Sequence, residues 1–312
     1  MRRVIRSLKF GFSEAAGFGG FFFWRGLERC LGVGGLFVVA RAFYLSRATF
    51  NELFRKPPPP RDEPEWLQTD GRLRARIRRR TQKYLNYLLK SFPDRLADPA
   101  WLGRCRVEGA EHVESARQAG RPVVLAFFHF GPIYTIRQWV RAHGLPAAAF
   151  VFGAQEARGG LSRFRDRRSP FPGVPINFYP RQLRAMTEFL AAGNILLIAV
   201  DTAAGRHTTA DVNGTWSLDL NTGPARLANR TGADLILVSI INEGPWRFRL
   251  KFSPPIPGAE LRTEPEQAAA NRRMLAAMLP DFKAHPDQFD LPRGWKRIPP
   301  AAKPPAPDRI LT

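Results

Sequence analysis

Short apolar runs alternate with stretches of helical periodicity along the middle of the chain, and this alternation constrains the fold more than any other feature. The apolar runs are candidate buried strands at residues 123–128, 147–152, 195–200 and 235–241. The helical stretches are at residues 134–143, 183–192, 224–230 and 264–283. Alternating strands and helices build a mostly parallel sheet with helices packed on it. The sequence therefore predicts an α/β domain with a mostly parallel sheet flanked by helices.

Shifts in composition divide the chain into four parts. Residues 1–55 are apolar and basic, and residues 56–64 contain four consecutive prolines, which exclude a helix or a central strand. The α/β domain is expected over residues 65–298, and the proline-rich tail 299–312 is expected to be disordered. Within the domain, residues 248–252 alternate between apolar and basic side chains, which predicts a half-exposed strand at an edge of the sheet.

The N-terminal segment 1–55 combines apolar area with positive charge. Glu14, Arg25 and Glu28 interrupt its apolar runs, so no uncharged stretch reaches the roughly 18–20 residues that a spanning helix needs. No small-residue cleavage site follows a clean apolar run, which argues against a signal peptide. We expect an apolar helical segment in the membrane interface, with a helical pair packed on the domain surface as the alternative. Residues 72–80 add an arginine-rich helix whose basic face is either solvated or in contact with anionic lipid headgroups.

The charge balance indicates an anionic partner. The chain has 48 Lys and Arg against 27 Asp and Glu, a net charge of +21. Nucleic acid, an acidic membrane surface or a phosphorylated substrate would each suit this excess. Cys30 and Cys105 are too few for a disulfide framework, a four-cysteine metal site or an iron–sulfur site. Phosphate-binding loops, GxGxxG, GxSxG and paired metal-ligand motifs are missing from the sequence, so no metal site is expected.

The strongest candidate site lies where the first apolar run ends. His129 follows the run 123–128 and precedes an expected helix, and sites in open α/β sheets form beyond the carboxyl ends of strands. A lone histidine in this place is often structural. However, the positive end of the helix favours a neutral imidazole that can accept a proton. Gly131 is expected to let a ligand approach the backbone, and N–H groups near it are expected to stabilise an oxyanion.

A carboxylate and several arginines could complete this site. Asp201 follows the apolar run 195–200 and could lie close to His129, although it could instead only turn the loop that follows. Arginines hold phosphate groups bidentately, although most of those present must be ordinary surface charge. The arginines expected to bind substrate are Arg181, Arg184 and Arg206, and the remaining candidates are Arg163, Arg165, Arg167 and Arg168.

Three motifs occur in order along the chain: His129-Phe-Gly-Pro, the stretch 183–201 that ends in Asp201, and Gly223-Pro-Ala-Arg followed by Thr231-Gly-Ala. Together they resemble the lysophospholipid acyltransferase-like superfamily, in particular its bacterial lipid A lauroyl/myristoyl acyltransferase branch. The similarity covers roughly residues 84–256 and, more loosely, the apolar N-terminus.

The resemblance implies a membrane-associated O-acyltransferase. It would move a fatty acyl chain from a thioester of acyl carrier protein or coenzyme A to a hydroxyl of a glycolipid or phospholipid. It also implies attachment to anionic lipids on the cytoplasmic face of the cell inner membrane, as a peripheral or monotopic protein. The acyl donor would be a co-substrate, and no metal or bound organic cofactor is expected.

The resemblance also assigns His129 as the general base, with an acidic partner five positions later. That position holds Tyr134, and a phenol with an unperturbed pKa near 10 does not stabilise an imidazolium as a carboxylate does. We therefore expect Asp201 to take the place of the acid. Two alternatives remain: a non-catalytic lipid-binding relative, suggested by Tyr134, and a nucleic-acid-binding protein, suggested by the net charge alone.

Overall fold

A computed structural model of the chain describes residues 2–54, 64–67, 73–88, 92, 104–151, 177–202, 205–244, 247–289 and 294–298. Three predictions fall outside the described residues. They concern the proline-rich linker up to residue 63, the arginines between residues 163 and 168, and the tail 299–312.

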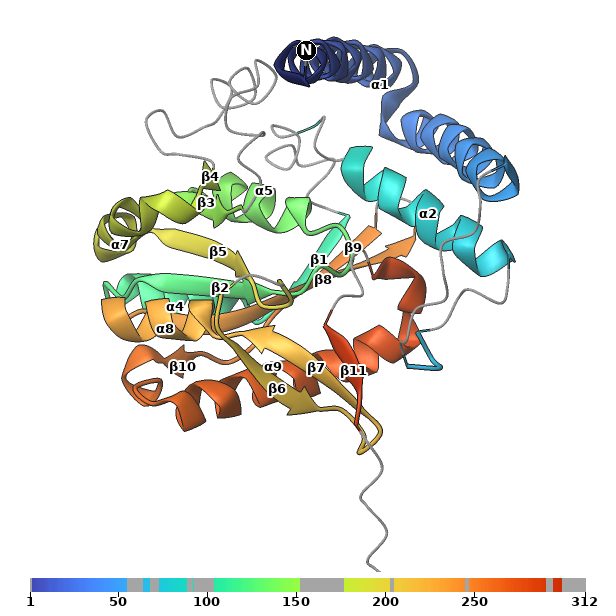
Figure 1. Ribbon diagram of the computed structural model, residues 1–312. Coiled ribbons are helices and arrows are strands. Elements are labelled where there is room, and N and C mark those ends of the chain that lie inside the picture. The colour runs from blue at the N-terminus through green and yellow to red at the C-terminus, as the bar shows by residue number, and fades with distance from the viewer. Residues whose placement is uncertain are drawn as a thin grey trace, which may run out of the picture.

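A mostly parallel sheet forms the centre of the molecule (Figure 1). Its strand order is β1-β9-β8-β2-β5-β3-β4, and β10 pairs with β8. The strands are β1 (Cys105–Glu108), β2 (Val123–Phe127), β3 (Ala147–Phe150), β4 (Asn177–Phe178), β5 (Ile195–Ala199), β8 (Asp234–Gly244), β9 (Arg247–Phe252) and β10 (Ile256–Pro257). β2 is parallel to both of its neighbours, β5 and β8. The predicted fold class and the four predicted apolar strands are confirmed.

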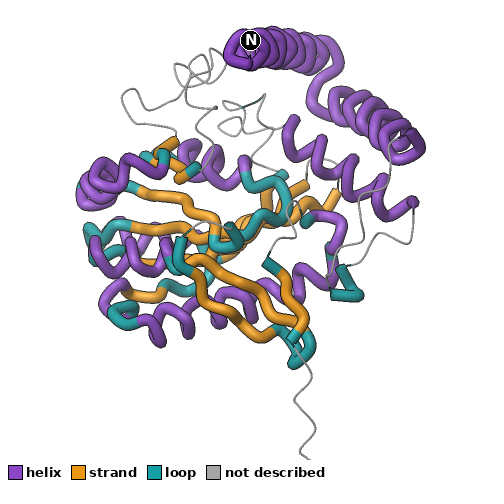
Figure 2. Tube along the Cα trace, viewed as in Figure 1, coloured by secondary structure: helices purple, strands orange, loops and turns teal. Residues whose placement is uncertain are grey.

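Helices cover both faces of this sheet, as Figure 2 shows. They are α4 (Ala110–Gln118), α5 (Tyr134–Ala142), α7 (Leu183–Ala191), α8 (Gly223–Thr231) and α9 (Glu264–Ala284). Successive residues of a strand point to opposite faces, so β2 contributes to two hydrophobic clusters. Val124 and Ala126 pack with α7, α8 and α9, whereas Val123 and Leu125 pack with α4 and α5. Burial on both faces explains why the central strands are continuous apolar runs.

The prediction that residues 248–252 form an edge strand was wrong. β9 lies between β8, to which it is antiparallel, and β1, to which it is parallel. Its alternation is nevertheless real, since Phe248, Leu250 and Phe252 are buried. The pattern reports burial on one face of a strand, and it cannot report whether a neighbour pairs with the strand's backbone.

A second, three-stranded antiparallel sheet was not predicted. It consists of β6 (His207–Asp211), β7 (Trp216–Asn221) and β11 (Trp295–Arg297), in the order β11-β7-β6. β6 has only one apolar residue, Ala210, so its alternation is weak. β7 alternates clearly, because Trp216, Leu218 and Leu220 are buried and polar residues lie between them. The Asp211-Val-Asn-Gly-Thr215 turn joins β6 and β7, and the Asp211 and Asn213 side chains accept backbone N–H bonds within it.

The long helix α9 begins with a capping box. The N–H of Thr263 donates to the Glu266 carboxylate at 2.7 Å, and this bond lowers the pKa of the Glu266 carboxyl. The Thr263 side chain in turn accepts the N–H of Glu266. The first N–H groups of a helix have no acceptor within the helix. These reciprocal bonds supply acceptors for two such N–H groups, and they fix where α9 starts.

The N-terminal segment α1 (Arg2–Phe54) consists of two helical arms that meet at a kink, where Gly32 has non-helical φ and ψ. Gly32 has φ +66° and ψ 179°, a conformation that glycine adopts readily and other residues rarely adopt. The second arm packs on α2 (Leu73–Leu88), where Leu36 and Tyr44 share a cluster with Leu85. Figure 1 shows the two arms of α1 running one after the other above the main sheet, with α2 beneath the second arm.

Three arginines of α2 contact other parts of the protein, whereas the sequence predicted a face in contact with water or with lipid headgroups. Arg76 and Arg80 both pair with Glu52 of α1, at 3.0 and 2.5 Å. Arg79 Nη2 donates to the carbonyl oxygens of Leu67 and Pro286, at 2.6 and 3.3 Å. These three arginines therefore join parts of the fold, while Arg74 and Arg78 remain exposed to solvent.

Large apolar side chains remain exposed along α1. They are Phe22, Phe23, Leu31, Val38, Val39, Phe43, Leu45, Phe50, Leu53 and Phe54. By length and composition alone, residues Gly19–Phe54 are also long and apolar enough to cross a membrane. The placement of this helix in the membrane interface stays a prediction.

Candidate active site

His129 and Asp201 lie side by side at the carboxyl edge of the main sheet. His129 comes two residues after the end of β2, and Asp201 comes two residues after the end of the adjacent strand β5. The pairing continues past the strands, because the N–H of Val200 donates to the carbonyl oxygen of Phe127 at 2.9 Å. The two loops therefore leave the sheet together, as the sequence had suggested for these residues.

Asp201 holds His129 through two hydrogen bonds. Asp201 Oδ1 lies 2.7 Å from His129 Nδ1, and Asp201 Oδ2 accepts the backbone N–H of His129 at 2.8 Å. A carboxylate can only accept, so Nδ1 carries the proton of this contact and Nε2 is the basic nitrogen of the neutral ring. The side chain of Asp201 is 1% exposed and that of His129 is 20% exposed. The carboxylate is thus buried against its partner, while the imidazole remains accessible from outside.

The loop that carries Asp201 is tied to the start of α8 by Asn221, a residue that the sequence reasoning missed. The Asn221 amide donates to Thr202 Oγ1 at 3.0 Å, and its oxygen accepts the N–H of Gly223 at 2.6 Å. His207 Nε2 also contacts the Thr202 carbonyl oxygen, at 2.7 Å. Asn221 is buried at the end of β7. The alternating run from Trp216 to Leu220 that precedes it is the sequence signal that could have pointed to it.

The structure shows how Gly131 packs within the fold, and its role toward a substrate stays a prediction. Gly131 is buried with φ +68°, and a Cβ built on it would lie 1.9 Å from the carbonyl oxygen of Ile240. Its N–H donates to the Gln288 carbonyl oxygen at 2.9 Å, and the N–H of Phe130 donates to Phe128. The group that approaches Gly131 is therefore β8, and these two N–H groups are engaged within the fold. Glycine is needed here for close packing of the histidine loop.

Tyr134 is the first residue of α5 and is partly buried. The Nδ1 contact of His129 goes to the carboxylate from β5 and not to this position. The positively polarised N-terminus of α5 follows the histidine loop directly.

Two of the predicted substrate-binding arginines take part in surface ion pairs. Arg184, in the first turn of α7, pairs with Glu188 at 2.8 Å, and Arg206 pairs with Glu264 at 3.1 Å. All four side chains are well exposed, so water and salt screen both pairs and they contribute little to stability. Arg181 is also exposed, in the short helix η4 (Pro180–Gln182) that precedes α7. Substrate binding by these arginines stays a prediction.

Residues 69–296 match the family model described as bacterial lipid A biosynthesis acyltransferase, and this range includes both His129 and Asp201. The chain is also similar to the crystal structure of the 1-acyl-sn-glycerophosphate (LPA) acyltransferase PlsC from Thermotoga maritima. That match has 17% sequence identity and a TM-score of 0.43, and it covers 91% of this chain and 98% of that chain. No curated protein sequence matches the chain.

Proposed function

Because the chain belongs to the bacterial lipid A biosynthesis acyltransferase family, we propose that it moves a fatty acyl chain from a thioester donor to a hydroxyl of a glycolipid or phospholipid. Family membership makes the protein a lipid acyltransferase. The thioester, the acceptor and the catalytic roles of individual residues are the proposed part. The observation that carries these roles is the two-bond contact between Asp201 and His129.

His129 acts as the general base in this proposal. Its Nε2 takes the proton of the acceptor hydroxyl while the hydroxyl oxygen attacks the thioester carbonyl carbon. The tetrahedral intermediate then collapses, the carbon–sulfur bond breaks, and the imidazolium returns the proton to the departing thiolate. The products are an ester and a free thiol. Acyl-acyl carrier protein or acyl-coenzyme A is the co-substrate, and the step needs no other cofactor.

Asp201 supplies the charge that Tyr134 lacks. An ionised carboxylate on Nδ1–H holds the imidazole in one tautomer and stabilises the imidazolium that forms during the reaction. The carboxylate is buried, so water screens its interaction with the ring only weakly. This contact favours a catalytic protein over the non-catalytic lipid-binding alternative, and the family match leaves the nucleic-acid-binding alternative without support.

We further propose that α1 attaches the enzyme to the cytoplasmic face of the cell inner membrane, where a lipid acceptor would be reached. Two observations support this. Large apolar side chains are exposed along the helix, and Arg29, Arg41 and Arg47 are exposed on it as well. Apolar area would enter the lipid, and each arginine near an anionic surface adds roughly 1 kcal/mol of attraction.

The proposal is tested by acyl transfer with the purified full-length protein in anionic vesicles. Acyl-acyl carrier protein and acyl-coenzyme A are supplied in turn, each with a lipid A precursor or a lysophospholipid as acceptor, and products are identified by mass spectrometry. We expect one donor–acceptor pair to give an ester product that His129→Ala does not form. Transfer to none of these hydroxyl-bearing lipids, or transfer that survives His129→Ala unchanged, would overturn the proposal. Comparing the lipids of cells with and without the protein identifies the natural acceptor.

A further inference from the structure

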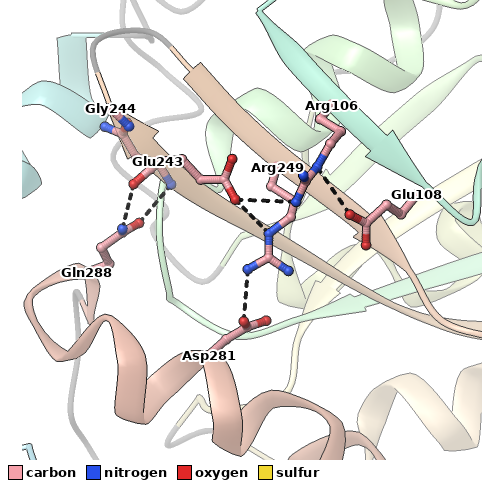
Figure 3. A network of polar contacts seen from close by, with 8 residues as sticks. Arg106, Glu108, Glu243, Gly244, Arg249, Asp281 and Gln288 are labelled. Atoms are coloured by element: carbon pink, nitrogen blue, oxygen red, sulfur yellow. Dashed lines mark hydrogen bonds and ion pairs between the residues drawn. The ribbon is translucent and has the colours of Figure 1, made fainter.

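The segment that follows α9 touches the histidine loop and the end of β8 at the same time. Its short helix, η6 (Pro286–Gln288), ends in Gln288, whose backbone carbonyl oxygen accepts the N–H of Gly131 at 2.9 Å. The Gln288 side chain contacts Asn242 of β8 instead. Its Oε1 accepts the Asn242 N–H at 2.9 Å, and its Nε2 donates to the Asn242 carbonyl oxygen at 2.8 Å. Figure 3 shows the Gln288 amide facing the end of β8.

The amide of Gln288 pairs with Asn242 as a peptide group of an added strand would. Both bonds go to the backbone of one residue, and Gln288 is 5% exposed, so they form largely without competition from water. The backbone adds a third connection, because Phe289 forms an antiparallel bridge with Phe130 of the histidine loop. Gln288 therefore ties this loop to β8.

Ion pairs fix the end of α9 from which η6 extends. Arg249 of β9 donates to Asp281 of α9 at 3.1 Å and to Glu243 at 2.9 Å, as Figure 3 shows. On the other side, Arg79 of α2 reaches the Pro286 carbonyl oxygen at 3.3 Å. The position of Gln288 is thus set by β9 and α2 and does not depend on the histidine loop alone.

We propose that Gln288 is a positioning residue that keeps the His129 imidazole on Asp201, an inference that rests on the proposed function. β2 lies between β5 and β8, and the loop after β2 is held on both sides. Asp201 ties His129 to the β5 side, and two residues later Gln288 ties Gly131 to the β8 side. Losing the second connection lets the loop shift. A displacement of about 1 Å in a catalytic group can lower the rate by roughly 10²-fold.

The test compares Gln288→Met with Gln267→Met in the full-length enzyme. Methionine keeps the length of the side chain and removes its hydrogen bonds. Gln267 is a matched control, because it is also buried, lies in α9, and donates to the Leu261 carbonyl oxygen away from the histidine loop. We expect both variants to lose a similar amount of stability. Only Gln288→Met should lower kcat, by about 10-fold or more, with each KM within about twofold of the parent value.

A second variant and a second background keep the result interpretable. Gln288→Glu can make both bonds only while its carboxyl is protonated, because an ionised oxygen would face the Asn242 carbonyl oxygen. Its kcat relative to the parent should therefore fall as the pH rises and the carboxyl ionises. In an Asp201→Asn background, Gln288→Met should lower kcat by less than about twofold, because the contact it protects is already weakened. A merely structural role predicts the same factor in both backgrounds.

Two results would overturn the positioning role. One is a folded Gln288→Met variant with kcat within about twofold of the parent, and the other is a loss of activity that only follows the folded fraction, as in Gln267→Met. His129→Ala separates this failure from failure of the proposed function. If His129→Ala is inactive while Gln288→Met is normal, only the positioning role is wrong, whereas an active His129→Ala removes the catalytic assignment itself.

Discussion

Both carboxylate oxygens of Asp201 are bonded to His129, one to the ring Nδ1 at 2.7 Å and the other to the backbone N–H at 2.8 Å. The contact fixes the orientation of the ring and the path of its loop at once. In our proposal, this carboxylate from the loop after β5 takes the role that the family's pattern gives to an acid five residues after the histidine, where this chain has Tyr134.

Asp201→Asn should lower kcat by about 10²–10⁴-fold in a folded protein, because a neutral amide neither stabilises an imidazolium nor enforces the tautomer with a proton on Nδ1. Tyr134→Phe is the matched variant at the family's acidic position and should stay within about threefold. Steady-state kinetics in vesicles measure both, with circular dichroism as the check on folding. A crippling effect of Tyr134→Phe beside a mild one of Asp201→Asn would reverse the assignment.

Gly131→Ala should destabilise the protein by several kcal/mol, because the new Cβ would meet the Ile240 carbonyl oxygen in addition to the strain of a positive φ. Gly144→Ala is the control. Gly144 has φ +72° but nothing within 4 Å of the added Cβ, so only the backbone term of about 1–2 kcal/mol applies. Thermal or denaturant unfolding compares the two. Equal losses of stability in the two variants would mean that β8 can move away from the Cβ added at position 131, and that the packing there is not tight.

Charged substitutions on the exposed face of α1 should weaken membrane binding. We expect Phe22→Asp, Val38→Asp and Phe50→Asp to reduce sedimentation with anionic vesicles, since each side chain buried in lipid contributes about 1.5–3 kcal/mol. Leu183→Asp is the control, because Leu183 is similarly exposed but lies on α7. Equal binding of the parent protein to neutral and anionic vesicles would refute the electrostatic part of the attachment.

Cys105 should resist alkylation at neutral and mildly alkaline pH. Burial raises the pKa of its thiol from 9.0 to about 11, so at pH 8 only about one molecule in 10³ carries the reactive thiolate. The unfolded chain loses this proton near pH 9 and the folded chain only near pH 11. Thiol ionisation therefore leaves stability unchanged below pH 9 and favours unfolding as the pH rises from about 9 to 11.

Mass spectrometry after iodoacetamide treatment measures the modification of each cysteine, with Cys30, which is exposed on α1, as the reference thiol. Denaturant should speed the modification of Cys105. Rapid modification of Cys105 in the folded protein would show that β1 opens readily.

The sequence predicts the main sheet well because its central strands are buried on both faces. Runs such as 195–200 are apolar throughout, and helices of clear periodicity separate them. β1 and β11 were missed, since they are short and pair with strands that are distant in sequence. The β6–β7 hairpin was missed although β7 alternates, because β6 carries almost only polar residues. Cys105–Glu108, for example, is a strand because it pairs with Phe248–Lys251. Pairing with a distant strand does not produce a recognisable local pattern of apolar and polar residues.

The same distinction, between local sequence patterns and contacts with distant residues, applies to the candidate active site. His129 and Asp201 follow apolar strands, so topology alone brings them to one edge of the sheet. Gln288 lies in a segment without such a marker, and Asn221 ends a strand that was not predicted. The roles of both come from hydrogen bonds to backbone groups of other elements. The sequence context of the glycine in His129-Phe-Gly-Pro cannot show that β8 fills the space beside it.

Acyl transfer by His129→Ala, measured in single turnover with vesicle-bound protein of verified fold, shows whether this histidine is the general base. We expect a rate at least about 10²-fold below that of the parent protein, with an unchanged unfolding temperature, because the general base is lost while the fold is kept. A folded His129→Ala variant that transfers the acyl chain within a few-fold of the parent rate would contradict this role.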